Sequence, residues 1–294
     1  MNAFTLRALP GMLLLALLLV WAAPAFAADS PTGAAALRER HAALGERLAR
    51  SPFKQPLLVE SSDTSNNVLG EVYARLAHPF TQASAVFNGP ARWCDVLMLH
   101  LNTKYCRSTA GPRGEPMLVL NVGRKYDQPA EQAPRLEFTL RMIAMTPDFM
   151  EAQLTAESGP LGTSNYLIVL QLLALDANTT FMHLSYGFSY GFASRLAMDA
   201  YLNTVARDKV GFTTLNNGNF IGGVRGVMER NVMRYYLAVE AYLDALSAPA
   251  GEQQERRLQN WFTASERYAR QLHELERQPY LEMKRRELQR AQAG

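Results

Sequence analysis

The five histidines are the residues of this chain best suited to acid–base chemistry or metal binding, because imidazole titrates near neutral pH. They are widely scattered, so the sequence predicts no metal site: His41, His78, His100, His183 and His273. Two of them, His100 and His183, lie beside segments expected to form a pocket, where Asp95 or Glu137 could act as acid or base. A hydrogen-bonded structural histidine and a solvated carboxylate are the commoner roles.

The chain contains only two cysteines, Cys94 and Cys106. The export signal described below places them in an oxidising compartment, in which paired thiols persist as disulfides. We therefore predict a disulfide between Cys94 and Cys106. A catalytic thiol near His100 is the alternative, but nearness in sequence is weak evidence for a thiol–imidazole pair.

No phosphate-binding loop, dinucleotide fingerprint, nucleophile elbow or metalloprotease motif occurs in the sequence, so no cofactor is expected. Two arginines, Arg141 and Arg225, are candidates for contact with an anionic headgroup. Arg225 lies at a glycine-rich helix start, where free N–H groups favour anions. A solvated arginine is the commoner role for both.

The composition is that of an ordinary globular protein: 294 residues, 48% hydrophobic and 19% charged. The formal net charge of +3 is too small and too evenly spread to indicate nucleic-acid binding. Nucleic acid is therefore not among the expected partners.

The first 27 residues have the pattern of an export signal. Arg7 supplies the positive charge, residues 11–20 form the apolar core, and Ala25-Phe-Ala27 is a cleavage site before Ala28. The uncharged run at 8–28 is long enough to span a bilayer, so an uncleaved anchor is the alternative, which Pro24 and the cleavage site disfavour. We expect a periplasmic or secreted protein, with peripheral membrane contact left open.

Residues 180–190 alternate as in a long strand, with Leu184, Tyr186 and Phe188 on one face and His183 on the other. Similar alternation or apolar runs predict strands at 70–76, 105–107, 117–122, 135–145, 149–156 and 164–175, and residues 51–67 read as loop and sheet edge. Short turns rich in glycine and proline join most of these strands. The expected arrangement is an antiparallel meander.

Helical spacing of apolar residues appears in six other segments. The expected helices are 34–50, 80–87, 91–99, 192–207, 228–246 and 253–277. The last two, joined by a short linker, predict a C-terminal helical hairpin.

The order strand, two helices, a run of strands and a long helix resembles the START-like, or helix-grip, superfamily over residues 70–212. The resembling features are Val72 to Leu76 followed by His78-Pro79-Phe80, the helix pair with Trp93, the meander, and helix 191–207. The resemblance implies an α+β fold, a curved antiparallel sheet wrapped on a long helix over a hydrophobic cavity. Lipids, sterols, polyketides and aromatic compounds are the usual cargo.

Four segments follow from this interpretation: a signal peptide at 1–27, an N-terminal helix and linker at 28–67, a START-like domain at 68–212 and a helical extension at 213–294. We predict noncovalent binding or transfer of a lipid or another hydrophobic small molecule. The predicted pocket lining is Leu136, Phe138, Leu140, Leu170, Leu184, Tyr186, Phe188, Leu196 and Tyr201, with His100, His183 and Arg141 as polar candidates. Two alternatives remain: a cyclase- or hydrolase-type enzyme using a polar cluster in the same pocket, and an envelope assembly factor acting through the C-terminal hairpin.

Overall fold

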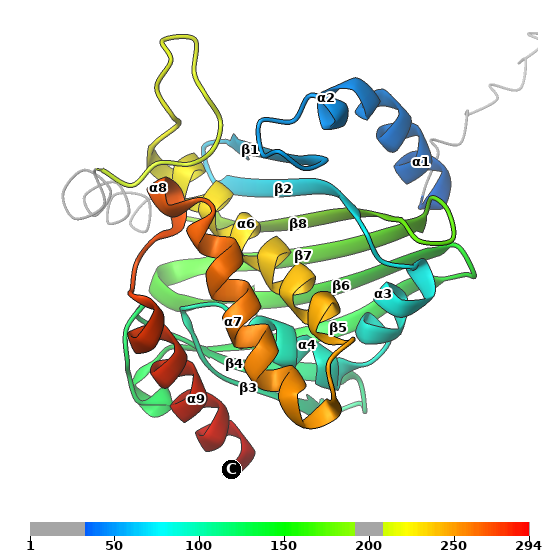
Figure 1. The fold of residues 1–294 in the computed structure, drawn as a ribbon. Coiled ribbons are helices and arrows are strands. Elements are labelled where there is room, and N and C mark those ends of the chain that lie inside the picture. The colour runs from blue at the N-terminus through cyan, green and yellow to red at the C-terminus, as the bar shows by residue number, and fades with distance from the viewer. Residues whose placement is uncertain (1–32, 192–207, 294) are drawn as a thin grey trace, which may run out of the picture. The chain divides into compact units, whose positions relative to one another are not determined.

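Eight antiparallel strands form a curved sheet in a computed structural model that describes residues 33–191 and 208–293 (Figure 1). The order across the sheet is β1-β2-β8-β7-β6-β5-β4-β3, so the consecutive strands β3 to β8 are neighbours and the predicted meander is confirmed. The strands are β1 Leu57–Asp63, β2 Asn67–Leu76, β3 Thr103–Ala110, β4 Pro116–Val122, β5 Arg135–Met145, β6 Phe149–Ser158, β7 Thr163–Ala174 and β8 Thr180–Tyr190.

The outermost strand β1 lies in residues 51–67, which the sequence predicts to be loop and sheet edge. The burial of its residues decreases along the strand, from fully buried Leu57 to exposed Asp63. Such a strand gives a weak alternating signal, because only its first half packs against the rest of the protein.

The two faces of the sheet follow the period of two that the sequence predicts. Leu184 of β8 and Leu170 of β7 are paired across the strands and face the main hydrophobic core. Phe181 and Leu173 are likewise paired but belong to a separate cluster on the opposite face. We call these the concave and the outer face, respectively.

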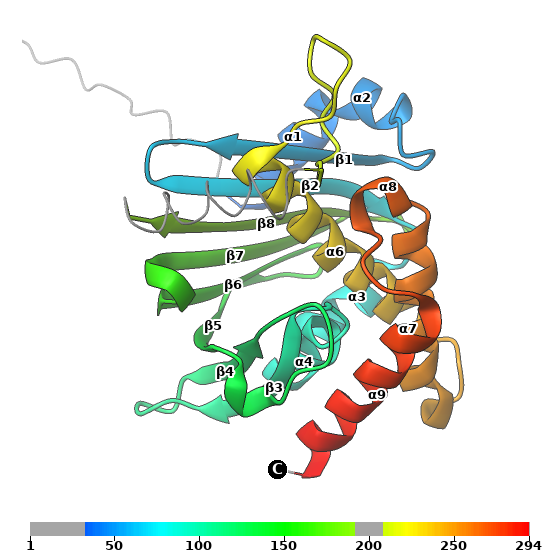
Figure 2. The same cartoon turned by 90° about the vertical axis from the view of Figure 1, so that its left-hand side faces the viewer.

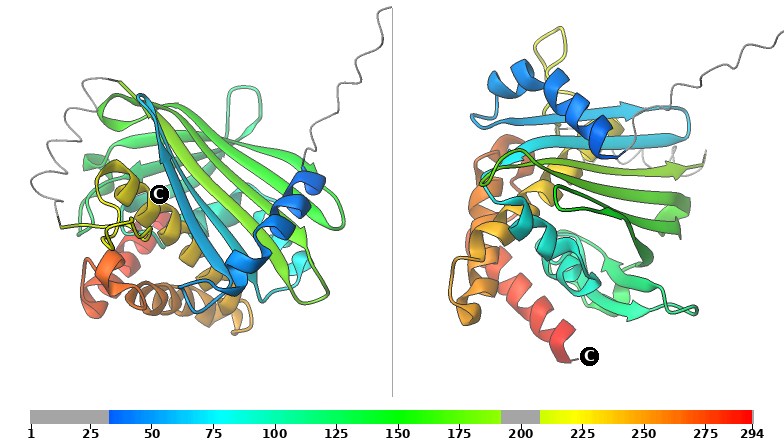
Figure 3. Two further views of the ribbon diagram at one scale, coloured as in Figure 1. Left: turned by 90° about the horizontal axis from the view of Figure 1, so that it is seen from above. Right: turned by 90° about the vertical axis from the view of Figure 1, so that its right-hand side faces the viewer.

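Two N-terminal helices, α1 (Ala34–Ala43) and α2 (Gly45–Ala49), cover part of the outer face (Figure 3). Leu37, Leu44 and Leu48 pack there in the same cluster as Tyr73 and Phe181. The predicted helix at 34–50 is therefore present, with a break at Leu44.

Helices α3 (Phe80–Phe87) and α4 (Pro90–Leu97) lie between β2 and β3 at the predicted positions. Pro90 occupies the first turn of α4, where its missing N–H is tolerated. Cys94 of α4 and Cys106 of β3 form a disulfide with an S–S distance of 2.02 Å, which confirms the predicted pairing. The bridge joins α4 to the edge strand of the sheet.

The long helix α6 (Gly223–Ala245) lies against the concave face and is buried on most of its sides (Figure 2). It crosses β2 at Gly70, where a Cβ atom would lie 2.7 Å from the Cγ atom of Met228. Only glycine permits this approach without movement of Met228. The predicted gripping helix at 191–207 lies outside the described residues. In the described chain α6 packs on the sheet, although it was assigned to the C-terminal extension.

Three helices follow: α7 (Gln253–Glu266), α8 (Ala269–Leu272) and α9 (Arg277–Ala293). Helices α6 and α7 lie side by side, as predicted for the hairpin (Figure 1). The prediction of one helix at 253–277 is wrong, because the chain leaves helical geometry at Tyr268 and again at His273. The apolar spacing of this segment also fits an unbroken helix, so the break was not visible in the sequence, and α9 was missed.

These elements confirm the predicted α+β class and the helix-grip arrangement, in which a curved antiparallel sheet packs against a long helix, with a C-terminal hairpin. Helices from both sides of residue 212 share one hydrophobic core with the sheet. The boundaries proposed for the four segments stay predictions. Among the described residues, no helix has both the length and the apolar character needed to cross a bilayer.

Candidate functional site

Four aromatic side chains meet on the concave face, near the end of β8 and the start of β7: Tyr166, Tyr186, Phe188 and Tyr235. We call them the aromatic cluster. The ring centroids of Tyr166 and Phe188 are 5.2 Å apart, and those of Tyr186 and Tyr235 are 5.7 Å apart. Tyr166 also meets Phe138 of β5 edge to face at 6.1 Å. The cluster therefore links three strands to helix α6.

The backbone explains why these rings converge. Tyr186 and Phe188 lie on the same face of β8, since they are two residues apart. Ile168 of β7 pairs with Tyr186, and Tyr166 lies two residues before Ile168, so Tyr166 points to this face as well. Tyr235 follows Val232 by three positions on α6, so both project from one side of the helix. Tyr186, Phe188 and Tyr235 are only partly buried, unlike the leucines beside them.

The tyrosine hydroxyls of the cluster differ in their hydrogen bonding. The Tyr166 hydroxyl lies 2.6 Å from the Thr163 hydroxyl. Within residues 33–191 and 208–293, the hydroxyls of Tyr186 and Tyr235 have no hydrogen-bond partner. Burial raises the pKa of Tyr186 and of Tyr235, so both stay protonated at neutral pH and can donate a hydrogen bond.

His100 lies beneath the cluster, with its imidazole stacked on the ring of Tyr235 at 4.8 Å. Its Nδ1 atom accepts a hydrogen bond from the Asn102 N–H at 3.1 Å, so the neutral ring carries its proton on Nε2. Burial, followed by the positive charges of Arg234 and Lys284, lowers the pKa of His100 well below its usual value. The Nε2 atom is enclosed and has no partner in the described chain.

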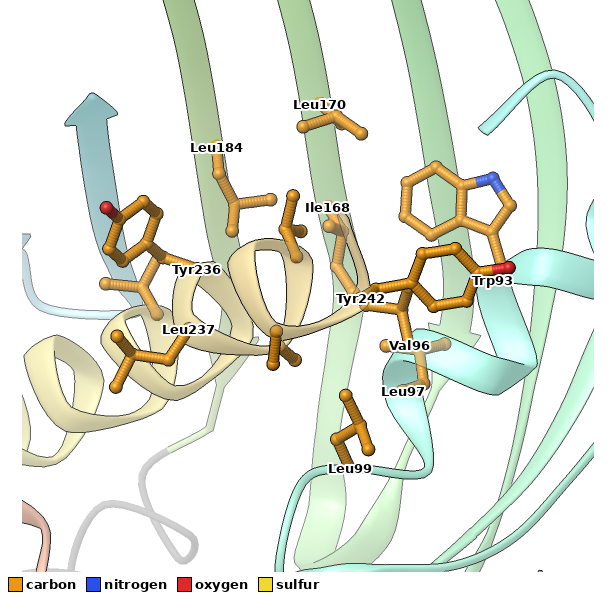
Figure 4. Close-up of a cluster of buried hydrophobic side chains, with 14 of the residues drawn as sticks. Trp93, Val96, Leu97, Leu99, Ile168, Leu170, Leu184, Tyr236, Leu237 and Tyr242 are labelled. Carbon is orange, nitrogen blue, oxygen red and sulfur yellow. The ribbon is translucent and has the colours of Figure 1, made fainter. Parts of the chain in front are cut away.

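The predicted lining residues divide into two groups. Five are closed into the core: Leu136, Phe138, Leu140, Leu170 and Leu184. Figure 4 shows Leu170 and Leu184 directed toward α6, whose side chains fill the space beside them. Tyr186 and Phe188 belong to the aromatic cluster, and Leu196 and Tyr201 lie outside the described residues.

Two of the polar candidates lie on the outer face. His183 is held between Glu71 and Gln171, each 2.9 Å from one ring nitrogen, and stacks on Tyr73 at 4.4 Å. The hydrogen bond from His183 is the main cause that lowers the pKa of Glu71. Arg141 is exposed and lines an outer hollow of about 920 Å³. Both occupy odd positions in strands whose even positions face the core, which is why they cannot reach it.

The polar cluster needed for the enzymatic alternative does not form among the described residues. His100 and His183 lie on opposite faces of the sheet, and Asp95 pairs with Arg257 at 3.2 Å. In the same part of the chain, no group of three histidine, cysteine or acidic residues could hold a metal ion.

Sequence reasoning missed two members of the cluster, Tyr166 and Tyr235. A signal existed for both: Tyr166 has the same parity as Ile168 and Leu170, and Tyr235 lies on the apolar stripe of its helix. What the sequence did not reveal is that the two segments, nearly seventy residues apart, lie together.

Comparison with known proteins finds distant structural similarities. No family model and no curated protein matches the chain. Among solved structures, norcoclaurine synthase from Thalictrum flavum is 12% identical, with a TM-score of 0.34, over 50% of this chain and 90% of that one. A START superfamily protein from Mycobacterium smegmatis is 14% identical, with a TM-score of 0.31, over 49% and 93%.

A protein from Thermus thermophilus is 8% identical, with a TM-score of 0.39, over 60% of this chain and 98% of that one. At these values the similarities support no statement about ligand or activity. The class of fold rests instead on the order of the strands and on the helix packed against them. It is an α+β helix-grip fold with a partly buried aromatic cluster on its concave face.

Proposed function

We propose that the protein binds a small hydrophobic molecule, noncovalently, against the aromatic cluster between the concave face and α6. One observation carries the proposal. Tyr186, Phe188 and Tyr235 keep part of their surface accessible on a face where the neighbouring leucines are closed into a core. Covering that surface with an apolar ligand supplies about 25 cal/mol per Å² of apolar area removed from water.

The ligand class follows from the hydroxyls of Tyr186 and Tyr235, which have no hydrogen-bond partner among the described residues. A site that is mostly apolar, with a few fixed polar groups, binds molecules that carry an apolar body and a matching polar atom. Tyr186 and Tyr235 donate to an oxygen acceptor, so a lipid or another hydrophobic molecule with a carbonyl, hydroxyl or carboxyl oxygen fits better than a pure hydrocarbon.

Export from the cytoplasm completes the proposal. The signal pattern at residues 1–27 directs the chain out of the cytoplasm, and the Cys94–Cys106 disulfide suits an oxidising compartment. Binding or transfer of a lipid in the periplasm or outside the cell is the role that combines these features.

Mass spectrometry of the protein purified from the periplasm tests both the binding of a hydrophobic molecule and the export of the chain. We expect an extractable hydrophobic molecule and a mature chain that begins at Ala28. A dansyl fatty acid then serves as a fluorescent probe of the emptied site. The absence of any bound molecule, together with no probe binding, would refute the proposal.

Point variants locate the site. Tyr186→Phe and Tyr235→Phe keep each ring and remove one hydroxyl, so each should weaken probe binding about fivefold. Tyr126→Phe is the matched control, because Tyr126 is 54% exposed and lies outside the cluster. Equal affinities in all three variants would show that the two hydroxyls make no hydrogen bond to the probe and would refute the predicted ligand class.

A further inference from the structure

A hairpin loop projects from the protein directly before α6, seen at the upper left of Figure 1 and at the top of Figure 2. Residues 210–224 contain no charged side chain. Thr214 and Phe220 pair as an isolated antiparallel bridge, and all residues from 214 to 220 are exposed. Two large apolar side chains lie in this tip, Leu215 with 40% and Phe220 with 39% of its surface exposed.

The base of the hairpin is firmly held by Glu229 of α6, which is fully buried. Its carboxylate accepts hydrogen bonds from the N–H groups of Phe212 and Thr213 at 2.6 and 2.8 Å. The hydroxyls of Thr213 and Ser61 each donate to it as well, at 2.7 Å. Four hydrogen bonds to the buried carboxylate of Glu229 hold the base of the loop in place. The tip is therefore kept exposed by the folded structure.

The chemistry of the tip favours a lipid surface over a protein partner. A stable protein interface needs about 800 Å² from each side, more than seven residues of a narrow hairpin supply. A bilayer requires only apolar side chains that enter the boundary between headgroups and acyl chains. The hollow at the base of the loop is lined by Arg47 and Glu46, and Arg47 pairs with Glu60 at 2.6 Å. It also contains exposed Arg50, a cation that favours anionic headgroups.

The loop is also connected to the aromatic cluster. Helix α6 starts at Gly223, directly after the hairpin, and its first residues Val224 and Met228 pack with Tyr186 and Phe188. A bilayer that receives the tip therefore lies beside the end of α6 that contacts the cluster.

We propose that residues 214–220 form a membrane-docking hairpin that inserts Leu215 and Phe220 into the interface of a bilayer containing anionic lipid. Docking to the bilayer does not require a bound ligand, so this inference can be tested independently of the proposed binding function.

Co-sedimentation of the mature protein with vesicles of phosphatidylcholine and phosphatidylglycerol tests this inference. The double variant Leu215→Ser with Phe220→Ser should lower the partition coefficient at least about tenfold, because two apolar side chains no longer enter the interface. Ile143→Ser is the matched control, since Ile143 is 50% exposed on strand β5. It should bind vesicles as the unmodified protein does.

Two outcomes would overturn the inference: no vesicle binding by the unmodified protein, or equal binding by the double variant. The dansyl fatty acid, measured without vesicles, reports ligand binding separately. Normal probe binding without vesicle binding would reject the docking hairpin and leave the proposed function in place.

Discussion

Replacement of Glu287 by glutamine should destabilise the protein strongly, because this carboxylate neutralises two buried lysines. Its oxygens lie 2.9 Å from the Lys104 Nζ atom and 2.7 Å from the Lys284 Nζ atom. All three side chains are fully buried between α9 and the start of β3. Removing one partner from a buried ion pair costs about 3–5 kcal/mol, since the remaining charge is left without compensation.

The pH dependence of the unfolding free energy gives a second, independent test of the interaction between Lys284 and Glu287. Burial lowers the pKa of Lys284 from 10.5 to about 8, although Glu287 opposes the change. Between these two pKa values the unfolded chain binds more protons, so stability should rise with pH across that window, by about 3 kcal/mol in total. Below pH 8 the lysine is protonated in both states and adds no slope. In the Glu287→Gln variant the rise should begin at a lower pH, because the opposing carboxylate charge is gone.

Urea unfolding followed by tryptophan fluorescence is a suitable assay, because Trp261 stacks on Tyr280 of α9 at 5.0 Å and reports the docking of that helix. Lys284→Met is the control, since it leaves Lys104 and Glu287 as a one-to-one pair. It should change stability by less than about 2 kcal/mol and reduce the rise above pH 8, of which a part remains because burial also lowers the pKa of Lys125. A loss below about 1 kcal/mol for Glu287→Gln, or an unchanged pH profile for Lys284→Met, would refute the reasoning.

Two further predictions concern the disulfide and the projecting hairpin. Replacing Cys94 and Cys106 together by serine should cost about 3 kcal/mol in unfolding free energy, because the bridge closes a loop with a sequence separation of 12; an unchanged urea midpoint would contradict this. Replacing Glu229 by glutamine should cost about 2–3 kcal/mol and speed hydrogen exchange of the Phe212 and Thr213 amides, which lose their charged acceptor. Protection of both amides as in the unmodified protein would show that the hairpin base has another support.

Most of the sheet was predictable from the sequence, because alternation is a local property. The period of two placed Leu184 and Tyr186 on one face and His183 on the other, and both assignments agree with the structure. The fold class followed from the order of such elements along the chain. The START-like interpretation therefore needed no long-range information.

The helical part was less predictable, because helix packing depends on partners distant in sequence. The apolar stripe of residues 228–246 marks a helix, but it does not say which surface the helix covers. Gly70 of β2 decides this in the folded chain, since its missing side chain admits α6. Helix α9 was missed because its buried face includes Lys284 and Glu287, residues that a sequence pattern assigns to solvent.

The sequence by itself determined seven of the eight described strands, their faces, the disulfide partners and half of the aromatic cluster, since each depends on neighbouring residues or on the only two cysteines. Strand β1 was not predicted. Tertiary structure alone decided that Tyr235 of α6 meets Tyr186 of β8, and that His100 stacks beneath them. It also closed Leu170 and Leu184 into the core, although they share the face of Tyr186. An inward-facing side chain is buried or keeps accessible surface according to the helix that lies opposite it. The position of that helix is determined only when the whole chain packs.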